Sequence, residues 1–229
     1  MERNEFAAHR IPDAQFLRQV RDDLPRHMGP YRLQHTLGVW KQCVELGKLF
    51  GAFDDTVFSA AQCAKLQLAG LMHDITKELD AQQHIAVCQK YGKTLTAEQL
   101  ASASVLHQTT GAYVAAELYG DYIDDEIFHA ISCHTTGERQ MSLFDKLLFL
   151  ADYIEPGRTF SDCTQIRDMF YDGLPAVQNS AVRLCKFLDA VVGSILEQTI
   201  SQLVRRKSVI DPRTVAAYNA LRMQNRETE

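Results

Sequence analysis

Residues 68–77 read LAGLMHDITK, an apolar helical run that ends in the adjacent pair His73 and Asp74 and is followed by Lys77. Neighbouring side chains on a helix point about 100° apart, so this pair can offer one nitrogen and one oxygen to metal ions near a helix end. The same pair would also be found at an ordinary polar helix end, where the aspartate acts as a local hydrogen-bond acceptor. The meaning of the pair therefore depends on the segments around it.

Apolar residues on both sides of this run recur at helical spacing, and only 12 Gly and 6 Pro interrupt the 229 residues. The pattern predicts an all-α fold without strands. With 46% apolar and 23% charged residues, the chain can bury one substantial core. The expected helices span 13–24, 32–50, 56–72, 80–91, 96–101, 103–119, 124–134, 142–154, 161–171, 174–205 and 212–224.

The segment 32–50 carries two apolar stripes, one of which includes Leu37 and the other Val39. A helix that is apolar on two faces is predicted to be buried. His35 lies one turn before Val39, so its imidazole faces the interior. A lone histidine there is more often a satisfied core residue, and a ligand role depends on partners elsewhere.

The segment 142–154 has the same character and places Asp145 and Asp152 on one side, near Phe149. An ionised aspartate among apolar neighbours is costly unless a cation or hydrogen bonds compensate it. We therefore expect Asp152 to have a functional partner. Asp145 is closer to the helix start, where the helix macrodipole gives it an ordinary structural explanation.

Two further histidines stand at predicted element edges: His107 precedes Gly111, and His134 opens the stretch HTTG. Singly, each is more often structural. Taken with the residues above, they give four imidazoles and two carboxylates on five segments, a suitable set for a mixed nitrogen and oxygen metal site in which a carboxylate could bridge two ions. The candidate ligands are His35, His73, Asp74, His107, His134 and Asp152.

Composition narrows the function. A net charge of -5, with Arg205–Lys207 as the only basic run, argues against a protein that grips a nucleic-acid backbone. We find no signal peptide and no run of roughly 20 apolar residues, so a soluble, cytoplasmic protein without membrane partners is expected. The six cysteines form no CxxC pair and are expected to be reduced and mostly buried.

The order of the candidate ligands resembles the HD-domain phosphohydrolase superfamily, and within it the YqeK-type symmetrical diadenosine tetraphosphate hydrolases of bacteria. The likeness covers roughly residues 30 to 220. It implies an HD-domain helical bundle over 31–229. Residues 1–30 take no part in the resemblance, and we expect them to form an N-terminal helical extension. The matching stretches are RLQHTLGV (32–39), AGLMHDITK (69–77), LHQTTGAYVA (106–115), AISCHTTG (130–137), MSLFDKLLFLADYIEPGRTF (141–160) and IDPRTVAAYN (210–219).

The resemblance implies that the six candidate ligands hold one or two divalent transition-metal ions, with iron favoured and manganese, cobalt, nickel or zinc compatible. It also implies a nucleotide substrate with phosphoanhydride bonds, diadenosine tetraphosphate, split at its centre into two ADP. Lys77 and Arg158 are the expected catalytic and phosphate-binding cations, although surface solubility is the plainer explanation for any single one. Thr135, Thr136 and Gly137 are expected phosphate contacts, with turn formation as the alternative.

Two other functions are left open. One is a different HD-type nucleotide phosphohydrolase that acts on a deoxynucleotide or on guanosine tetraphosphate. The other is a noncatalytic nucleotide-binding or protein-binding module, whose expected mark is the loss of ligands. The complete ligand set favours an enzyme. A homodimer is left open, and no function is assigned to His9, His27, His84 or His129.

Overall fold

The computed structural model describes residues 9–53 and 55–226, and every regular element in that part of the chain is a helix. The predicted all-α class is confirmed, and the bounds follow the apolar periodicity closely. The elements are α1 (Ala14–Asp23), η1 (Leu24–Arg26), α2 (Pro30–Gly51), α3 (Ala60–Met72), α4 (Ala81–Lys90), α5 (Ala97–Ala101), η2 (Ala103–Val105), α6 (Leu106–Tyr119), α7 (Asp125–Cys133), α8 (Leu143–Ile154), α9 (Ser161–Val177), α10 (Ala181–Arg205) and α11 (Pro212–Arg226).

Side-chain caps fix where several helices begin. Ser59, Asp80, Thr96 and Ser142 each accept a hydrogen bond from the backbone N–H three residues ahead, and the side chain at that third position bonds back to the cap. This capping box satisfies two N–H groups that the helix itself leaves without partners. It explains why α3 starts at residue 60 rather than at 56 as expected.

The boundary expected between residues 171 and 174 is wrong. Gly173 and Pro175 are typical stop signals, yet α9 continues through both to Val177. A β-carbon on Gly173 would lie 2.4 Å from the ring of Phe187, so the glycine lets α10 pack closely against α9. The break falls instead before Ser180, whose side chain accepts from the N–H of Arg183 and starts α10.

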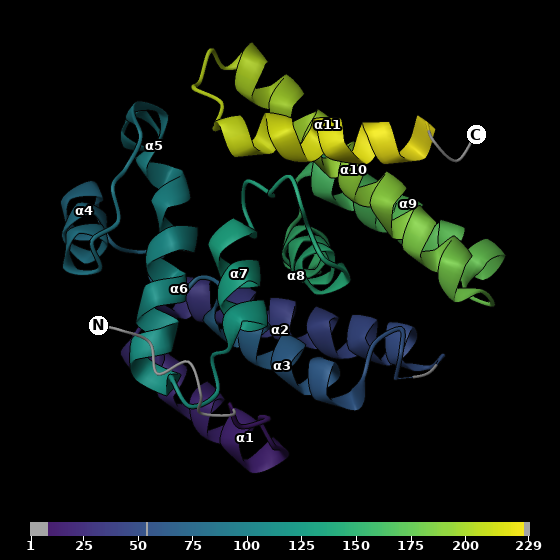
Figure 1. Ribbon diagram of the computed structural model, residues 1–229, viewed down its shortest axis with the longest axis horizontal. Coiled ribbons are helices and arrows are strands. Elements are labelled where there is room, and N and C mark those ends of the chain that lie inside the picture. The colour runs from purple at the N-terminus through teal and green to yellow at the C-terminus, as the bar shows by residue number, and fades with distance from the viewer. Residues whose placement is uncertain (1–8, 54, 227–229) are drawn as a thin grey trace.

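Helix α8 lies at the centre of the bundle and contacts α2, α3, α7, α9 and α10 (Figure 1). Its Leu147, Leu148 and Leu150 are fully buried, as expected for a helix that is apolar on two faces. The far ends of the chain pack on either side of this centre. Helices α10 and α11 lie together beyond α8, whereas α1 lies across the opposite side, against α3.

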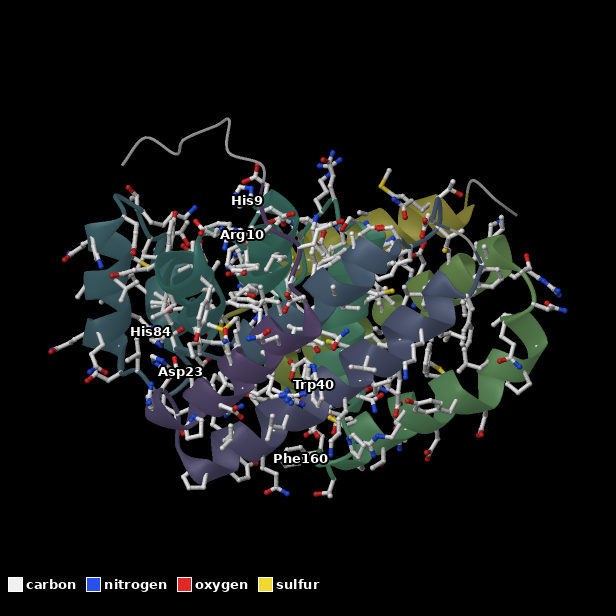
Figure 2. All side chains as sticks on the ribbon, turned by 90° about the horizontal axis from the view of Figure 1, so that it is seen from below. His9, Arg10, Asp23, Trp40, His84 and Phe160 are labelled. Atoms are coloured by element: carbon white, nitrogen blue, oxygen red, sulfur yellow. The ribbon has the colours of Figure 1, made fainter. Side chains whose placement is uncertain are left out.

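The segment 9–30 joins the same core as the rest of the chain. Leu17 and Val20 of α1 are buried in it, and the guanidinium of Arg21 lies 4.4 Å from the centre of the Trp40 ring on α2 (Figure 2). A cation over an indole face is attracted by the ring quadrupole, which adds to the apolar contact. The division of the chain at residue 30 stays a prediction.

All six cysteines are free, and four of them are buried, as predicted. Within the described residues, no helix combines the length and the apolar character that crossing a membrane requires.

Candidate metal centre

Helix ends converge on one point of the bundle, and each brings a candidate ligand. His73 and His134 immediately follow α3 and α7, His107 opens α6, and Asp152 lies in the last turn of α8. His35 comes from the second turn of α2. The structure thus brings together all six residues that the sequence singles out.

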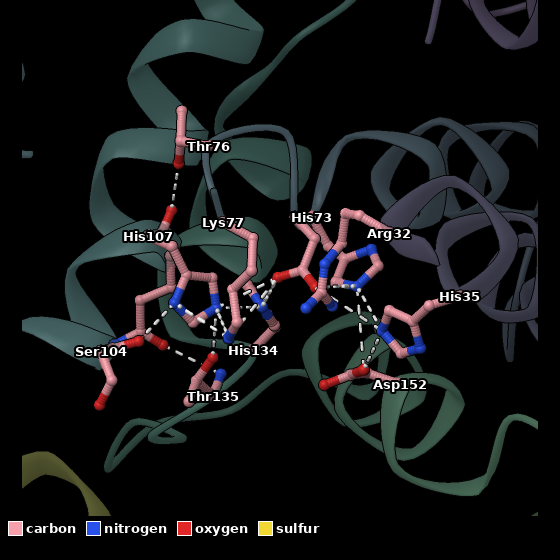
Figure 3. A network of polar contacts seen from close by, with 12 residues as sticks. Arg32, His35, His73, Thr76, Lys77, Ser104, His107, His134, Thr135 and Asp152 are labelled. Carbon is pink, nitrogen blue, oxygen red and sulfur yellow. Dashed lines mark hydrogen bonds and ion pairs between the residues drawn. The ribbon is translucent and has the colours of Figure 1, made fainter. Parts of the chain in front are cut away.

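The cluster has two halves. In the first, Nε2 of His35 lies 3.4 Å from Nε2 of His73 and 3.0 Å from Oδ1 of Asp152. In the second, Nε2 of His107 lies 3.1 Å from Nε2 of His134. Figure 3 shows His35 and Asp152 on one side, and His107 and His134 on the other.

Asp74 joins the two halves. Its Oδ2 lies 3.5 Å from Nε2 of His73 and 3.6 Å from Nε2 of His35. Its Oδ1 lies 3.2 Å from Nε2 of His107 and 3.6 Å from Nε2 of His134. Each oxygen of the carboxylate therefore serves a different pair of imidazoles, which is the arrangement of a bridging ligand.

The opposite ring nitrogen of each histidine is fixed by an acceptor. Nδ1 lies 2.8 Å from the Gly70 carbonyl for His73, 2.7 Å from the Ser104 carbonyl for His107, and 2.8 Å from the Ile131 carbonyl for His134. A carbonyl only accepts, so these Nδ1 atoms carry protons and the Nε2 lone pairs face one another. The Nε2 lone pairs of His107 and His134 lie 3.1 Å apart and call for a cation between them, so this donor set fits one or two divalent ions.

His35 is fixed in a different way, by a carboxylate. Its Nδ1 lies 3.0 Å from Oε1 of Glu155, and the backbone N–H of Gly157 donates to the other oxygen of Glu155 at 2.8 Å. A β-carbon on Gly38 would lie 2.3 Å from that second oxygen. Gly38 therefore makes the room in which Glu155 reaches the imidazole.

Burial and mutual charge set the protonation of the cluster. Burial lowers the pKa of His73, and burial together with Lys77 lowers the pKa of His107 well below its ordinary value. Burial alone would raise the pKa of Asp74, but the neighbouring imidazoles of His73 and His134 hold it well below its usual range. Neutral imidazoles beside ionised carboxylates are the states in which these groups bind metals.

Asp152 and His35 form the more exposed edge of the cluster. Burial opposes ionisation of Asp152, but Arg158 and His35 hold its pKa well below its usual range. Burial likewise opposes protonation of His35, yet hydrogen bonds to Asp152 and Glu155 raise its pKa to about 9. This half of the cluster attracts positive charge strongly.

Three cations surround the carboxylates. Arg32 lies 2.5 Å from Oδ2 of Asp74, Arg158 lies 2.5 Å from Oδ1 of Asp152, and Nζ of Lys77 lies 3.0 Å from Nε2 of His107. Their side chains are 18 to 32% exposed, whereas that of Asp74 is 3% exposed. The cations therefore lie between the buried ligands and solvent.

Within the described part of the chain, Arg32 and Arg158 each have one N–H group without an acceptor. Nε of Arg32 and Nε of Arg158 are buried and have no hydrogen-bond acceptor among the described residues. A buried N–H without an acceptor is costly, and a guanidinium suits the paired oxygens of a phosphate. Each of these two guanidiniums therefore has one N–H group in the described structure that lacks an acceptor of the kind that an anion such as phosphate supplies.

The residues of the HTTG stretch have mixed roles. The backbone N–H groups of Thr135 and Thr136 donate to Oε1 of Gln108 at 2.9 and 3.2 Å, and the Thr136 hydroxyl donates to the Gly137 carbonyl. Gly137 has φ +68° and donates to the Cys133 carbonyl, which closes α7. These groups thus hydrogen-bond to Gln108 or to backbone carbonyls. The Thr135 hydroxyl, in contrast, contacts a candidate ligand, because it lies 3.0 Å from Nε2 of His107. Phosphate contacts by these residues stay a prediction.

Sequence reasoning did not single out Arg32, Gln108 or Glu155 as members of the site. All three stand inside motifs that carry the resemblance, at the start of RLQHTLGV, after the histidine of LHQTTG, and in ADYIEP. Their side chains are common surface types, so only their motif positions could have marked them. Arg167 supports the same region, because its guanidinium donates to the carbonyls of Ile154 and Glu155.

Other histidines lie outside the cluster. His27 pairs with Asp23 at 3.1 Å, and Nδ1 of His84 on α4 lies 2.9 Å from the Thr110 hydroxyl on α6 (Figure 2). Both contacts are ordinary structural ones.

Known proteins resemble this chain over most of its length. A family model described as "HD domain" matches residues 32–157. Symmetrical bis(5'-nucleosyl)-tetraphosphatase of Halalkalibacterium halodurans is 32% identical over 207 residues, which cover 87% of this chain and 94% of that protein. The protein of the same name from Staphylococcus aureus is 31% identical over 190 residues, 82% of this chain and 85% of that one.

A crystal structure from Clostridium acetobutylicum, described as a predicted HD superfamily hydrolase involved in NAD metabolism, superposes with a TM-score of 0.74. It is 27% identical and covers 90% of this chain and 97% of that one. The chain therefore belongs to the HD-domain phosphohydrolase superfamily. It is an enzyme of this hydrolase class, as the complete donor set predicts.

Proposed function

We propose that this enzyme hydrolyses diadenosine tetraphosphate symmetrically: one water is added across the central phosphoanhydride, and two molecules of ADP leave. Three observations support the proposal. Relatives matched over more than 80% of this chain carry the name of that activity. Four imidazoles lie within 3.6 Å of the oxygens of Asp74, and Asp152 contacts one of them, His35. Arg32 and Arg158, whose Nε atoms have no acceptor among the described residues, contact the carboxylates of this cluster.

We propose His35, His73 and Asp152 as ligands of one divalent transition-metal ion and His107 and His134 as ligands of a second, with Asp74 shared between them. When bound, such ions acidify a water to hydroxide near neutral pH and offset the charge of the phosphate under attack. Iron is our first choice, since the resemblance points to it. Imidazole and carboxylate ligands also suit manganese, cobalt, nickel and zinc.

The other residues of the site orient the substrate. A tetraphosphate carries several negative charges, and Lys77, Arg32 and Arg158 supply three positive ones at the exposed edge of the cluster. The reaction needs no protein nucleophile, because phosphoanhydride cleavage depends mainly on positioning and charge stabilisation. We propose that Lys77 and Arg158 hold the phosphate oxygens, with the Thr135 hydroxyl beside His107 as a further contact.

Analysis of the products tests this function. Protein loaded with iron under argon, or with manganese in air, is incubated with diadenosine tetraphosphate, and the nucleotides are separated by ion-exchange chromatography. ADP as the sole product supports the proposal, whereas ATP with AMP contradicts symmetrical cleavage. Asp74→Asn provides the inactive control, because it weakens the shared ligand.

A substrate panel separates the alternatives. Faster turnover of a deoxynucleoside triphosphate or of guanosine tetraphosphate than of the dinucleotide would assign the same metal core to another substrate. Tight nucleotide binding without turnover, in protein shown by elemental analysis to carry metal, would contradict a catalytic role.

A further inference from the structure

A second group of metal-binding side chains lies where α7 meets α8. His129 and Cys133 are four residues apart on α7 and therefore share one face of that helix. Asp145, in the first turn of α8, points at the same place. Nδ1 of His129 lies 3.0 Å from Oδ1 of Asp145 and 4.0 Å from Sγ of Cys133.

The three atoms converge rather than form a chain. Both contacts of His129 fall on the same ring nitrogen, and one nitrogen, one oxygen and one sulfur lie within 4.8 Å of one another. One N–H group can donate well to only one of the two partners. A cation can contact all three donors at once, with small shifts of each side chain.

Asp145 has one oxygen to spare for such an ion. Its Oδ2 is the helix-cap oxygen, which accepts from the backbone N–H and the hydroxyl of Ser142 at 2.7 and 2.8 Å. The cap confirms the ordinary explanation expected for this aspartate. It also holds the carboxylate rigidly, so that Oδ1 is fixed toward His129.

The group is reached from outside the protein. The His129 side chain is 44% exposed and lines a cavity of about 380 Å³ together with Ser132 and Glu138. Glu138 lies within electrostatic range of both His129 and Cys133. A water from the cavity can therefore complete a four-coordinate site.

We propose that His129, Cys133 and Asp145 bind a divalent ion of the zinc class, separate from the ions of the HD cluster. A thiolate, an imidazole and a carboxylate are all common zinc ligands, and the thiolate favours zinc over magnesium or calcium. The proposal does not depend on the function proposed above. Because Cys133 immediately precedes His134, an ion here also fixes the last turn of the helix that positions a donor of the first cluster.

Cobalt spectroscopy distinguishes the two sites, because the HD cluster contains no sulfur donor among its six residues. The full-length reduced protein is titrated with Co²⁺ under argon, beyond the two equivalents that we propose for the HD cluster. A thiolate-to-cobalt charge-transfer band in the near ultraviolet should develop in the unchanged protein. Added Zn²⁺ should then displace the cobalt and abolish the band.

Variants assign the band. Cys133→Ser and His129→Ala should lose it, whereas Cys88→Ser, which removes another buried thiol on α4, should keep it. Since Cys133 is buried, Cys133→Ser is interpreted only if its circular-dichroism spectrum is helical. If Cys133→Ser does not fold, His129→Ala, which changes a half-exposed position, decides the matter. Absence of the band from the unchanged protein, or its persistence in His129→Ala or in folded Cys133→Ser, overturns the proposal.

Discussion

Nδ1 of His35 and Oε1 of Glu155 lie 3.0 Å apart, although 120 residues separate them in the chain. The contact links the second turn of α2 to the residue that follows α8. It fixes the ring so that Nε2 faces Asp152 at 3.0 Å. Such carboxylate partners orient metal-binding imidazoles and raise their basicity.

Replacing Glu155 should therefore weaken metal binding without removing a ligand. We expect Glu155→Leu to lower the affinity for Mn²⁺ about 10- to 100-fold, and Glu155→Gln to lower it less, because the amide oxygen still accepts from Nδ1. Competition titration with a chelator measures the affinity. Glu117→Gln, which changes an exposed carboxylate paired with Lys90, is the matched control. Equal affinity in Glu155→Leu and the unchanged protein would show that the contact does not position His35.

Asp74 presents its two oxygens to different pairs of imidazoles, so the geometry predicts two ions rather than one. Protein stripped with chelator and reloaded with Mn²⁺ should bind two equivalents. His134→Ala should retain about one, because the first half of the cluster is intact, and Asp74→Ala should retain less than one. Elemental analysis after gel filtration gives the count. One equivalent in the unchanged protein together with none in His134→Ala would indicate a single shared ion instead.

The positions of the six donors could be predicted because short motifs carry them. The HD pair, HTTG and ADYIEP each contain a residue of the cluster. The residue types of Arg32 and Glu155 did not mark them, since their roles depend on contacts with residues 42 and 120 positions away. The sequence of one helix does not show which carboxylate from another segment contacts its side chains.

Local signals also set the expected helix bounds, including the end expected at residue 171, which the structure contradicts. Gly173 and Pro175 suggest a helix end, but the packing of Phe187 against Gly173 is a tertiary contact that local propensity does not contain. The cluster of His129, Cys133 and Asp145 likewise could not be predicted from the sequence, because only the packing of α7 against α8 brings its residues together.

The cations at the edge of the cluster should affect catalysis more than metal content. We expect Arg158→Gln to lower kcat/KM for diadenosine tetraphosphate about 100-fold, because a donor to a developing negative charge is lost. Lys77→Gln should have a similar effect. Elemental analysis should show unchanged metal content in both. Arg222→Gln, which breaks a surface pair with Glu197, controls for the loss of a positive charge. Equal kcat/KM values for Arg158→Gln and the control would contradict a role for Arg158 in catalysis.

Asp211 predicts a pH-dependent part of the stability. Burial opposes its ionisation, but hydrogen bonds from the side chain and backbone N–H of Arg213 lower its pKa. A carboxyl whose folded pKa lies below its unfolded value stabilises the fold above the unfolded value of about 3.9, and this stability is lost as the pH falls through the folded pKa. Asp211→Asn should therefore unfold at lower urea than the unchanged protein at pH 7, with the difference shrinking below pH 4.

A double-mutant cycle with Arg213→Gln isolates this pair from other effects of the substitution. We expect a coupling free energy of about 1 kcal/mol at pH 7, which should vanish in acid. A coupling that is unchanged between pH 7 and pH 3 would mean that the ionised carboxylate is not the stabilising form.

Two glycines inside helices allow packing to be separated from helix propensity. A β-carbon on Gly70 of α3 would lie 2.7 Å from Sγ of Cys43 on α2, whereas one on Gly193 of α10 would meet no atom within 4 Å. Alanine favours a helix over glycine by about 0.5–1 kcal/mol, so Gly193→Ala should raise the free energy of unfolding by that amount. Gly70→Ala should lower it by about 1–3 kcal/mol, because the added methyl group forces α2 and α3 apart.

Urea unfolding of both variants measures the difference, provided that the dependence on urea concentration stays the same. Gly70 also supplies the carbonyl that fixes Nδ1 of His73 at 2.8 Å. Displacement of α3 should therefore weaken Mn²⁺ binding in Gly70→Ala and leave it unchanged in Gly193→Ala. Stabilisation by both substitutions would show that α2 and α3 have room to spare, and that the close approach at Gly70 does not position the ligand.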